Sequence, residues 1–244
     1  MKSSKNRATR HLVVSGFVLA AFASSQAAGG STQTAEGARK APTVKQMVVF
    51  NSGRAKLRTV RAAGLKVKVG SRRRSVGTGT PLAALARSQP GRIGLRSFGG
   101  QLYVSSIASD RARGLSGWLY KVGNKLASAG AADPSGPFGS GRLRTGQRVT
   151  WYYGSLEGQS GPRTLTLKVT DGSAPGTATA RVRSYDDEGR SRPEAGVSVK
   201  ASGGTPATTS ADGSAVVAAT AGRRAFTAAK SGSIRSFPVR ATVR

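Results

Sequence analysis

The stretch that decides the fold runs from Gly117 to Tyr153 and reads GWLYKVGNKLASAGAADPSGPFGSGRLRTGQRVTWYY. It contains both tryptophans of the chain, and aromatic residues make up only 6% of the sequence, so their concentration here marks a small core. Trp118, Tyr120 and Val122 alternate along its first part, and a second alternating run ends at Tyr153. Period-two alternation is typical of half-buried strands, which favour aromatic and β-branched residues. The stretch therefore predicts two strands joined by a Gly/Pro-rich loop.

Residues 1–27 predict a cleavable signal peptide. Four basic residues lie between Lys2 and Arg10, an apolar run follows from Leu12 to Ala23, and Ser25-Gln26-Ala27 supplies small residues at the cleavage position. The apolar run is too short to cross a bilayer, which takes roughly 20 residues. We expect an exported protein without a transmembrane segment, either secreted or held noncovalently at the cell surface.

Charge is the second feature of the composition. Removing the four basic residues of the signal peptide from the formal charge of +29 leaves +25. Such a field attracts polyanions, including cell-wall polymers, acidic polysaccharides, anionic lipid headgroups and extracellular nucleic acid. A high-arginine proteome, or selection for solubility alone, also explains it. The chain has no cysteine, so disulfides cannot stabilise its domains and packing must do so.

The segment 28–60 predicts a flexible basic lead, with one apolar run, Val44–Phe50, that could form a strand. Beyond it, the valines and lysines of Leu65–Val69 alternate, and Gly70-Ser71 predicts a hairpin turn before Arg72, Arg73 and Arg74. These three arginines are candidate contacts for a polyanion. Charged residues on a solvated strand face also protect sheet edges. Grooves for single-stranded nucleic acid interleave aromatic residues, which this segment lacks, so we expect no specific nucleic-acid recognition.

A short helix is predicted over Pro81–Arg87. Thr80 is a good N-cap and proline suits the first helical position, while Pro90-Gly91 ends the helix near Ser88. A glycine-rich turn and a strand over Gln101–Ile107 follow. The order of hairpin, helix and further strands predicts an α+β domain of the β-grasp kind over residues 61–170.

The motifs of this region resemble a domain of unknown function in exported bacterial proteins, itself similar to the C-terminal domain of transcobalamin and intrinsic factor. The family pattern is Gly-Trp-x-Tyr-x-Val-Asn-Gly followed by Leu-x-x-Gly-Asp-x-Val-x-Trp-x-Tyr. The chain departs from it with Gly123-Asn124 and with Gln147 in place of aspartate. The resemblance implies a β-grasp-like module that binds a ligand or a surface. Its matching positions are Trp118, Tyr120, Val122, Leu143, Gly146, Val149, Trp151 and Tyr153.

Residues 177–244 predict a second, all-β domain after a boundary at Asp171–Gly176 (DGSAPG). Short strands about ten residues apart, separated by Asp/Gly turns, are typical of an Ig-like sandwich. Pro238 would place the last strand at an edge. The run from Thr209 to Ala229 also resembles bacterial Ig-like and carboxypeptidase-regulatory-like domains, which implies a spacer or adhesion module. The predicted strands are Ala178–Ser184, Gly196–Ala201, Ser214–Thr220, Arg224–Lys230 and Ser236–Val243.

Few residues suit catalysis. The single histidine, His11, leaves with the signal peptide, and zinc sites need cysteine or histidine. Asp186, Asp187 and Glu188 are the only closely spaced acids, and we interpret them as a solvated turn in preference to a calcium loop. No phosphate-binding glycine loop is present. We expect no enzyme activity, no metal and no cofactor.

The candidate ligand-binding residues are Trp118, Tyr120, Phe138 and Tyr152. One interpretation makes the aromatic residues the core of a small sheet; the other leaves some exposed as a stacking platform beside the loop at 132–141. Alternation turns Tyr152 away from the core, which favours it as the stacking residue. The predicted function is a secreted, non-catalytic binding or adhesion protein at the cell envelope. Its partner would be a glycan, a cell-wall polymer or another anionic polymer, and the alternative is a structural protein held to such a polymer by charge.

Overall fold

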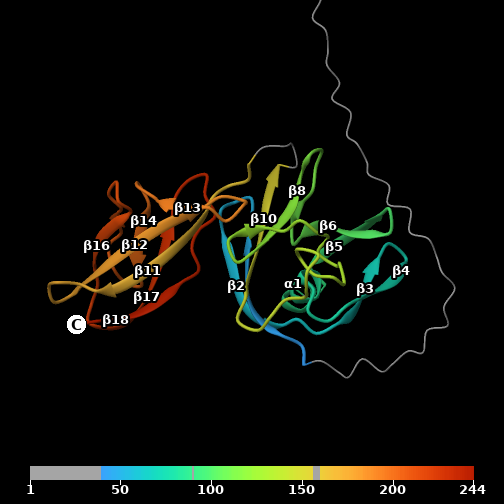
Figure 1. Cartoon of the computed structure of the whole chain (residues 1–244), viewed down its shortest axis with the longest axis horizontal. Coiled ribbons are helices and arrows are strands. Elements are labelled where there is room, and N and C mark those ends of the chain that lie inside the picture. The colour runs from blue at the N-terminus through green and yellow to red at the C-terminus, as the bar shows by residue number, and fades with distance from the viewer. Residues whose placement is uncertain (1–39, 90, 156–159) are drawn as a thin grey trace, which may run out of the picture. The chain divides into compact units, whose positions relative to one another are not determined.

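The computed structural model describes residues 40–89, 91–155 and 160–244, and strands dominate this part of the chain (Figure 1). The predicted signal peptide and residues 28–39 of the predicted lead lie outside the described residues. Residues Lys40–Arg244 form one compact unit. Its single described helix, α1 (Pro81–Ser88), has eight residues, and no described helix is long and apolar enough to cross a membrane.

The central element is a five-stranded sheet with the order β2-β1-β10-β8-β9. The middle strand, β10, is a parallel neighbour of β1 although their residues lie about 100 positions apart in sequence. All other pairs in this sheet are antiparallel. The strands are β1 (Thr43–Val49), β2 (Ala55–Arg61), β8 (Ser116–Val122), β9 (Lys125–Leu126) and β10 (Arg148–Ser155).

Most of the second half of the predicted flexible lead (28–60) is not flexible, because it forms strands β1 and β2. Val44 and Val48 are buried against the helix side of the sheet, while Met47 is buried on its other side. The sequence interpretation missed their importance because β1 gains its neighbour only when β10 arrives from far along the chain. The short apolar run Val44–Phe50 does form the suggested strand, over Thr43–Val49.

Two small sheets and α1 surround the helix side of the central sheet. Thr80 caps the helix by accepting a hydrogen bond from the Ala83 N–H, and Pro81 occupies its first turn, as predicted. Gly70 has φ +61°, and Gly99 and Gly100 have φ +54° and +79°, so glycine supplies the positive φ that two-residue hairpin turns require. These sheets consist of β3 (Leu65–Val69) with β4 (Arg72–Val76), and of β5 (Ile93–Phe98), β6 (Gln101–Ile107) and β7 (Asp110–Arg111).

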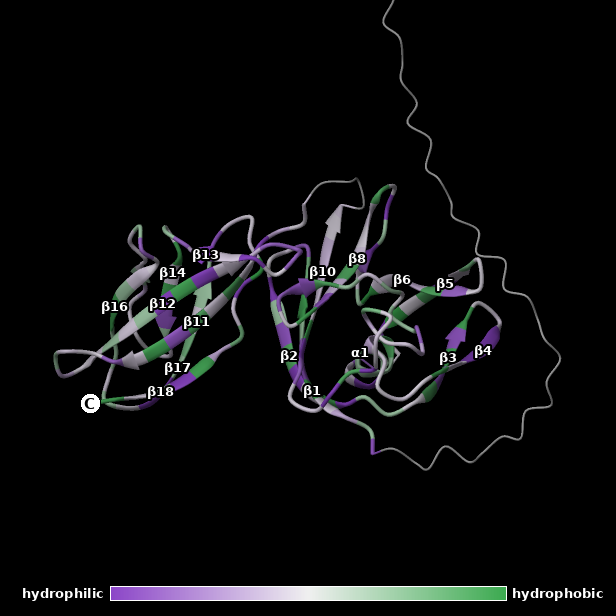
Figure 2. Ribbon diagram, in the orientation of Figure 1, coloured by the Kyte–Doolittle hydropathy of each residue, from purple (hydrophilic) through white to green (hydrophobic). Residues whose placement is uncertain are grey.

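The first hydrophobic cluster fills the space between α1, the small sheets and the central sheet. Leu82 and Leu85 of α1 are fully buried in it. Trp118, Tyr120 and Trp151 belong to the same cluster, so the interpretation of these aromatics as core residues is correct for most of their surface. Figure 2 shows the contrast with β4, which is coloured as hydrophilic along its arginines.

The C-terminal part contains two four-stranded sheets that share a second hydrophobic cluster, including Val182, Val199 and Phe226. The first sheet pairs β12 with β11, β13 and β16, and the second has the order β15-β14-β17-β18. β18 is an edge strand, and Pro238 lies just before it. The strands are β11 (Thr164–Asp171), β12 (Thr177–Tyr185), β13 (Ser191–Pro193), β14 (Ser198–Ala201), β15 (Ala207–Thr208), β16 (Ser214–Ala218), β17 (Gly222–Ala229) and β18 (Val239–Val243).

The predicted boundary at Asp171–Gly176 requires a correction. Strand β11 pairs along its whole length with β12, so this segment is the turn of a hairpin and not a division between domains. Leu165, Leu167 and Val169 of β11 pack into the second cluster. The sequence interpretation assigned β11 to the preceding domain because turn-forming residues look alike in a hairpin and in a linker.

A third, smaller cluster covers the other side of the central sheet. It contains Met47 of β1, Tyr152 of β10, and Ile234 and Phe237 from the segment before β18. Next to it, the Lys121 Nζ donates to the Pro162 carbonyl oxygen at 2.8 Å and pairs with the Asp187 carboxylate at 2.8 Å. Both sides of the central sheet are therefore covered.

Candidate functional site

A pocket of about 670 Å³ lies against strands β6 and β8 and the segment 126–131. Its size falls within the range of roughly 300–1,000 Å³ that is usual for small-ligand sites. Strand β10 contributes Trp151 to its wall, and the β5–β6 hairpin contributes Arg96 and Gln101. The apolar part of the lining includes Leu102, Val104, Trp118, Tyr120 and Trp151.

Trp118 and Tyr120 are fixed in place by hydrogen bonds and ring contacts. The Trp118 indole N–H donates to the Asp110 carbonyl oxygen at 3.1 Å, and the Tyr120 hydroxyl donates to the Ala129 carbonyl oxygen at 2.7 Å. The Tyr120 and Trp151 rings pack with centroids 5.0 Å apart. Burial, reinforced by the charge of Asp133, raises the pKa of Tyr120. This phenol therefore stays protonated and acts as a hydrogen-bond donor.

Trp151 has an unusual feature for a buried residue. It is 1% exposed, it lines the pocket, and its indole N–H has no hydrogen-bond partner among the described residues. Leaving a buried donor unpaired costs about 1–3 kcal/mol, and such groups are uncommon.

Charged side chains at the pocket give it a positive balance. Arg96 and Arg111 are both exposed, and neither has a carboxylate partner in the described part of the chain. The one acid in the lining, Asp133, accepts a hydrogen bond from the Ser135 backbone N–H at 2.8 Å. Hydroxyl groups of Ser105 and Ser128 add neutral polar contacts.

The predicted ligand-binding residues do not form one site. Trp118 and Tyr120 line the pocket, but each is less than 9% exposed, so neither offers an open stacking surface. Phe138 is half-buried outside the lining, with the Lys125 ammonium 5.7 Å from its ring centroid. Alternation does turn Tyr152 away from the first cluster, but the third cluster covers it and leaves it 1% exposed. Tyr152 cannot serve as the predicted stacking residue.

Sequence reasoning missed the contribution of β6 to the pocket. Tyr103 is 52% exposed and lines it, beside the buried Leu102 and Val104. The signal was available in the alternation of LYV, which turns Tyr103 outward, but only the folded chain brings β6 next to β8. Arg96 and Arg111 gave no signal, because they are two of many dispersed arginines.

Arg72, Arg73 and Arg74 lie elsewhere, on the exposed strand β4, and none of them lines the pocket. Arg73 stands directly opposite Lys68 of β3, and both are exposed. Like charges at such a position are destabilising. No ion pair to these three arginines occurs among the described residues.

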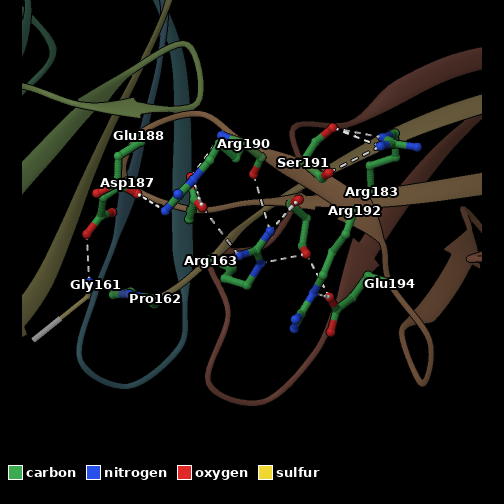
Figure 3. Close-up of polar contacts among 12 residues, drawn as sticks. Gly161, Pro162, Arg163, Arg183, Asp187, Glu188, Arg190, Ser191, Arg192 and Glu194 are labelled. Atoms are coloured by element: carbon green, nitrogen blue, oxygen red, sulfur yellow. Dashed lines mark hydrogen bonds and ion pairs between the residues drawn. The ribbon is translucent and has the colours of Figure 1, made fainter.

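The acidic trio at 186–188 lies in a turn, as predicted, and Glu188 is exposed, but ion pairs hold all three carboxylates in place. Asp187 accepts the Gly161 N–H at 2.7 Å (Figure 3). It also pairs with the buried Lys121 at 2.8 Å. Asp186 and Glu188 both pair with Arg190, at 2.9 and 3.1 Å. Burial lowers the pKa of Lys121, an effect that the Asp187 carboxylate counteracts.

The same region holds a second carboxylate with several donors. Glu194 accepts a hydrogen bond from the Ser184 hydroxyl at 2.6 Å, and it pairs with Lys230 and with Arg192. Hydrogen bonds from Lys230 and Ser184 lower the pKa of Glu194 to about 2. Among the described residues, no group of three or more histidine, cysteine or acidic side chains is arranged to hold a metal ion.

Comparison with known proteins gives no family for this chain: no protein-family model matches it, and neither does any curated protein sequence.

Proposed function

We propose that this chain is an exported, non-catalytic binding protein of the cell envelope that takes its ligand into the pocket between β6 and β8. The pocket carries the proposal, because it combines an apolar wall with a few polar groups, which is the usual composition of a ligand site. Export is supported by the signal-peptide pattern of residues 1–27.

A β-grasp-like module followed by an Ig-like module is the domain arrangement that we propose. The first assignment is supported by the β1–β2 hairpin, by the parallel pairing of β1 with the late strand β10, and by α1 on one side of that sheet. The two sheets around the second cluster support the other. The likeness to the transcobalamin C-terminal domain rests on the motif residues from Trp118 to Tyr153.

A non-catalytic role is supported by how the described carboxylates are used. Asp187 and Glu194 are held by cations. Asp212 accepts hydrogen bonds from the hydroxyls of Ser210 and Ser214. In the pocket itself, Asp133 holds the backbone of its own turn. These acids have structural partners that a general acid or base would have to give up.

The two tryptophans make the pocket proposal testable without a label, because Trp118 and Trp151 are the only tryptophans and both line the pocket. A tryptophan-free library of oligosaccharides, peptides and small acids should contain ligands that change the intrinsic fluorescence saturably. Ser128→Phe, which narrows the pocket from an exposed position, should abolish the change. Ser140→Phe, exposed outside the lining, should not. Ligands that bind Ser128→Phe as tightly as the unmodified chain would contradict the proposal.

The second candidate function is retention on an anionic polymer through the β3–β4 hairpin. The facing, exposed cations Lys68 and Arg73 support it, since a bound anion would relieve their repulsion. Arg73→Glu should stabilise the folded chain by about 0.5 kcal/mol and weaken its retention on polyphosphate or on an acidic polysaccharide. Retention should also fall steeply as salt rises from 0.05 to about 0.5 M. The measurements are urea unfolding and elution from a polyanion column. Unchanged elution of Arg73→Glu would exclude the hairpin.

A further inference from the structure

The pocket is lined by consecutive residues of strands β6 and β8, which indicates that it borders the edges of these strands. The lining includes every residue from Gln101 to Ser106 of β6 and from Gly117 to Tyr120 of β8. Side chains along a strand alternate between its two faces. A pocket that touches every residue in turn therefore borders the edge of the strand, where the backbone N–H and C=O groups lie.

On the β8 side, the unpaired edge is centred on Trp118. The Gly123 N–H donates to the Arg148 carbonyl oxygen, so in this antiparallel pair the odd-numbered residues of β8 bond to β10 and the even-numbered residues point the other way. Of these, Ser116 bonds to Arg113, and the Tyr120 carbonyl oxygen accepts the Ala127 N–H. Trp118 lies between them, and its backbone N–H and C=O have no partner among the described residues.

Strand β6 presents a similar edge. Positive φ at both Gly99 and Gly100 defines a type I′ turn, whose flanking residues Phe98 and Gln101 form a hydrogen-bonded pair. The alternation of antiparallel pairs then directs the backbone groups of Leu102 and Val104 away from β5. Strand β7 covers β6 only from Ser106 onward, apart from one bond to the Ser105 carbonyl oxygen. Two unpaired strand edges therefore border the same pocket.

We propose that the occupant of this pocket is an extended peptide segment of a partner protein, which adds as a strand along the edges of β6 and β8. The proposal rests on the proposed function of the pocket and names its ligand class. A peptide strand supplies what these edges lack, because its own N–H and C=O groups bond to Trp118, Leu102 and Val104. A sugar would stack on open aromatic faces, and among the pocket aromatics only Tyr103 is exposed, while Trp118 and Tyr120 are each more than nine-tenths buried.

The surroundings of the pocket define the chemistry of the peptide. Tyr103, which lines the pocket, is one of five large hydrophobic side chains exposed in the described part of the chain, and two more, Phe98 and Leu115, lie within three residues of lining residues in sequence. Arg96 and Arg111 carry uncompensated positive charge at the same pocket. Alternate side chains of an added strand point to the same side. The fitting peptide therefore carries apolar residues at alternate positions and at least one aspartate or glutamate.

The test uses the purified full chain and a display library of random, tryptophan-free linear dodecapeptides. The proposal expects enrichment of acidic peptides with alternating apolar residues, whose binding changes the tryptophan fluorescence. Because neighbouring residues of a strand direct their N–H groups to opposite sides, and both sides are bonded here, N-methylation should weaken binding at least tenfold at consecutive positions over the bound stretch and leave the ends of the peptide unaffected. In hydrogen-exchange NMR, the Trp118 amide should become protected on binding. The Leu119 amide, which faces β10, should not change.

Charge variants supply a second measurement that does not depend on an altered core. Arg111→Glu should weaken the binding of an acidic peptide at least tenfold. The same variant should bind more tightly to a peptide in which lysine replaces the acidic residue. Arg113→Glu, exposed outside the lining, is the matched control. Tolerance of N-methylation at every position overturns the proposal, as does Trp118 protection by self-association alone. Saturable binding of sugars without any peptide overturns it while the proposed function stands. If no compound of the fluorescence library and no displayed peptide binds, both the peptide proposal and the proposed function are wrong.

Discussion

Glu194 is a nearly buried acidic residue whose carboxylate and backbone both hold other segments of the C-terminal part. Its carboxylate is almost buried, yet it receives the Ser184 hydroxyl and two cations that are themselves partly exposed. Its carbonyl oxygen also accepts the Thr209 hydroxyl at 2.7 Å, so both ends of the residue join β12 to the segments that follow it. The hydrogen bonds and ion pairs of Glu194 therefore stabilise the strands and loops around the second hydrophobic cluster.

The low pKa of Glu194 predicts how stability responds to acid. The folded pKa of about 2 lies below the ordinary value of about 4.3, so the contribution is fully present above pH 4.3 and is lost as pH falls toward 2. Glu194→Gln should lower the free energy of unfolding by roughly 2 kcal/mol at pH 7 and by much less at pH 2. Urea unfolding across this range measures the difference. Equal losses at both pH values would show that the carboxylate charge is not responsible.

At the scale of elements, α1 shows how local signals determine a short helix. Thr80 is fully buried, donates its hydroxyl proton to the Gly77 carbonyl oxygen at 2.9 Å and accepts the Ala83 N–H at 3.2 Å. Thr80→Ala should cost about 1–2 kcal/mol through loss of the cap. Thr80→Ser should keep most of it. Thermal unfolding of the two variants gives the comparison, and equal losses would assign the effect to the threonine methyl group.

Elements with local signals are the ones that the sequence predicts correctly. The helix, the hairpin turns at Gly70 and Gly99, and the strand at 101–107 all depend on neighbouring residues. The significance of β1 and the burial of Tyr152 depend on partners about 80 or more residues away, which no local pattern specifies. The pocket follows the same rule: Trp118 and Tyr120 were expected, whereas Tyr103 joins them only through the packing of β6 near β8.

At the scale of the whole molecule, the described unit has two large hydrophobic clusters whose unfolding need not be coupled. The Lys121–Asp187 pair and the third cluster provide the coupling between them. Both tryptophans lie in the first cluster, so their fluorescence reports that part alone. Circular dichroism reports both parts. In the unmodified chain, we expect the two signals to change together on unfolding.

Removing the lysine should separate these signals. Lys121→Met leaves the Asp187 carboxylate without its cation, which for a buried pair costs about 3–5 kcal/mol. The denaturation curves from fluorescence and circular dichroism should then no longer coincide. Lys168→Met, on an exposed position of β11, is the matched control and should behave like the unmodified chain. Coincident curves for Lys121→Met would show that the third cluster couples the two parts without the ion pair.

The parallel pairing of β1 with β10 also has a consequence for the order of events during biosynthesis. Among the described strands, β1 and β2 come first in the chain, but β10, the second partner of β1, is completed about 100 residues later. Such non-local pairings slow folding, and an unpaired apolar strand is prone to aggregate while it waits. β2 follows β1 directly and covers its other edge, and the lysine and arginines of β2 make that outer strand of the sheet a poor partner for other chains. The edge of β1 that faces β10 therefore stays open until the last strands of this sheet are in place, whatever β2 has already done at the other edge.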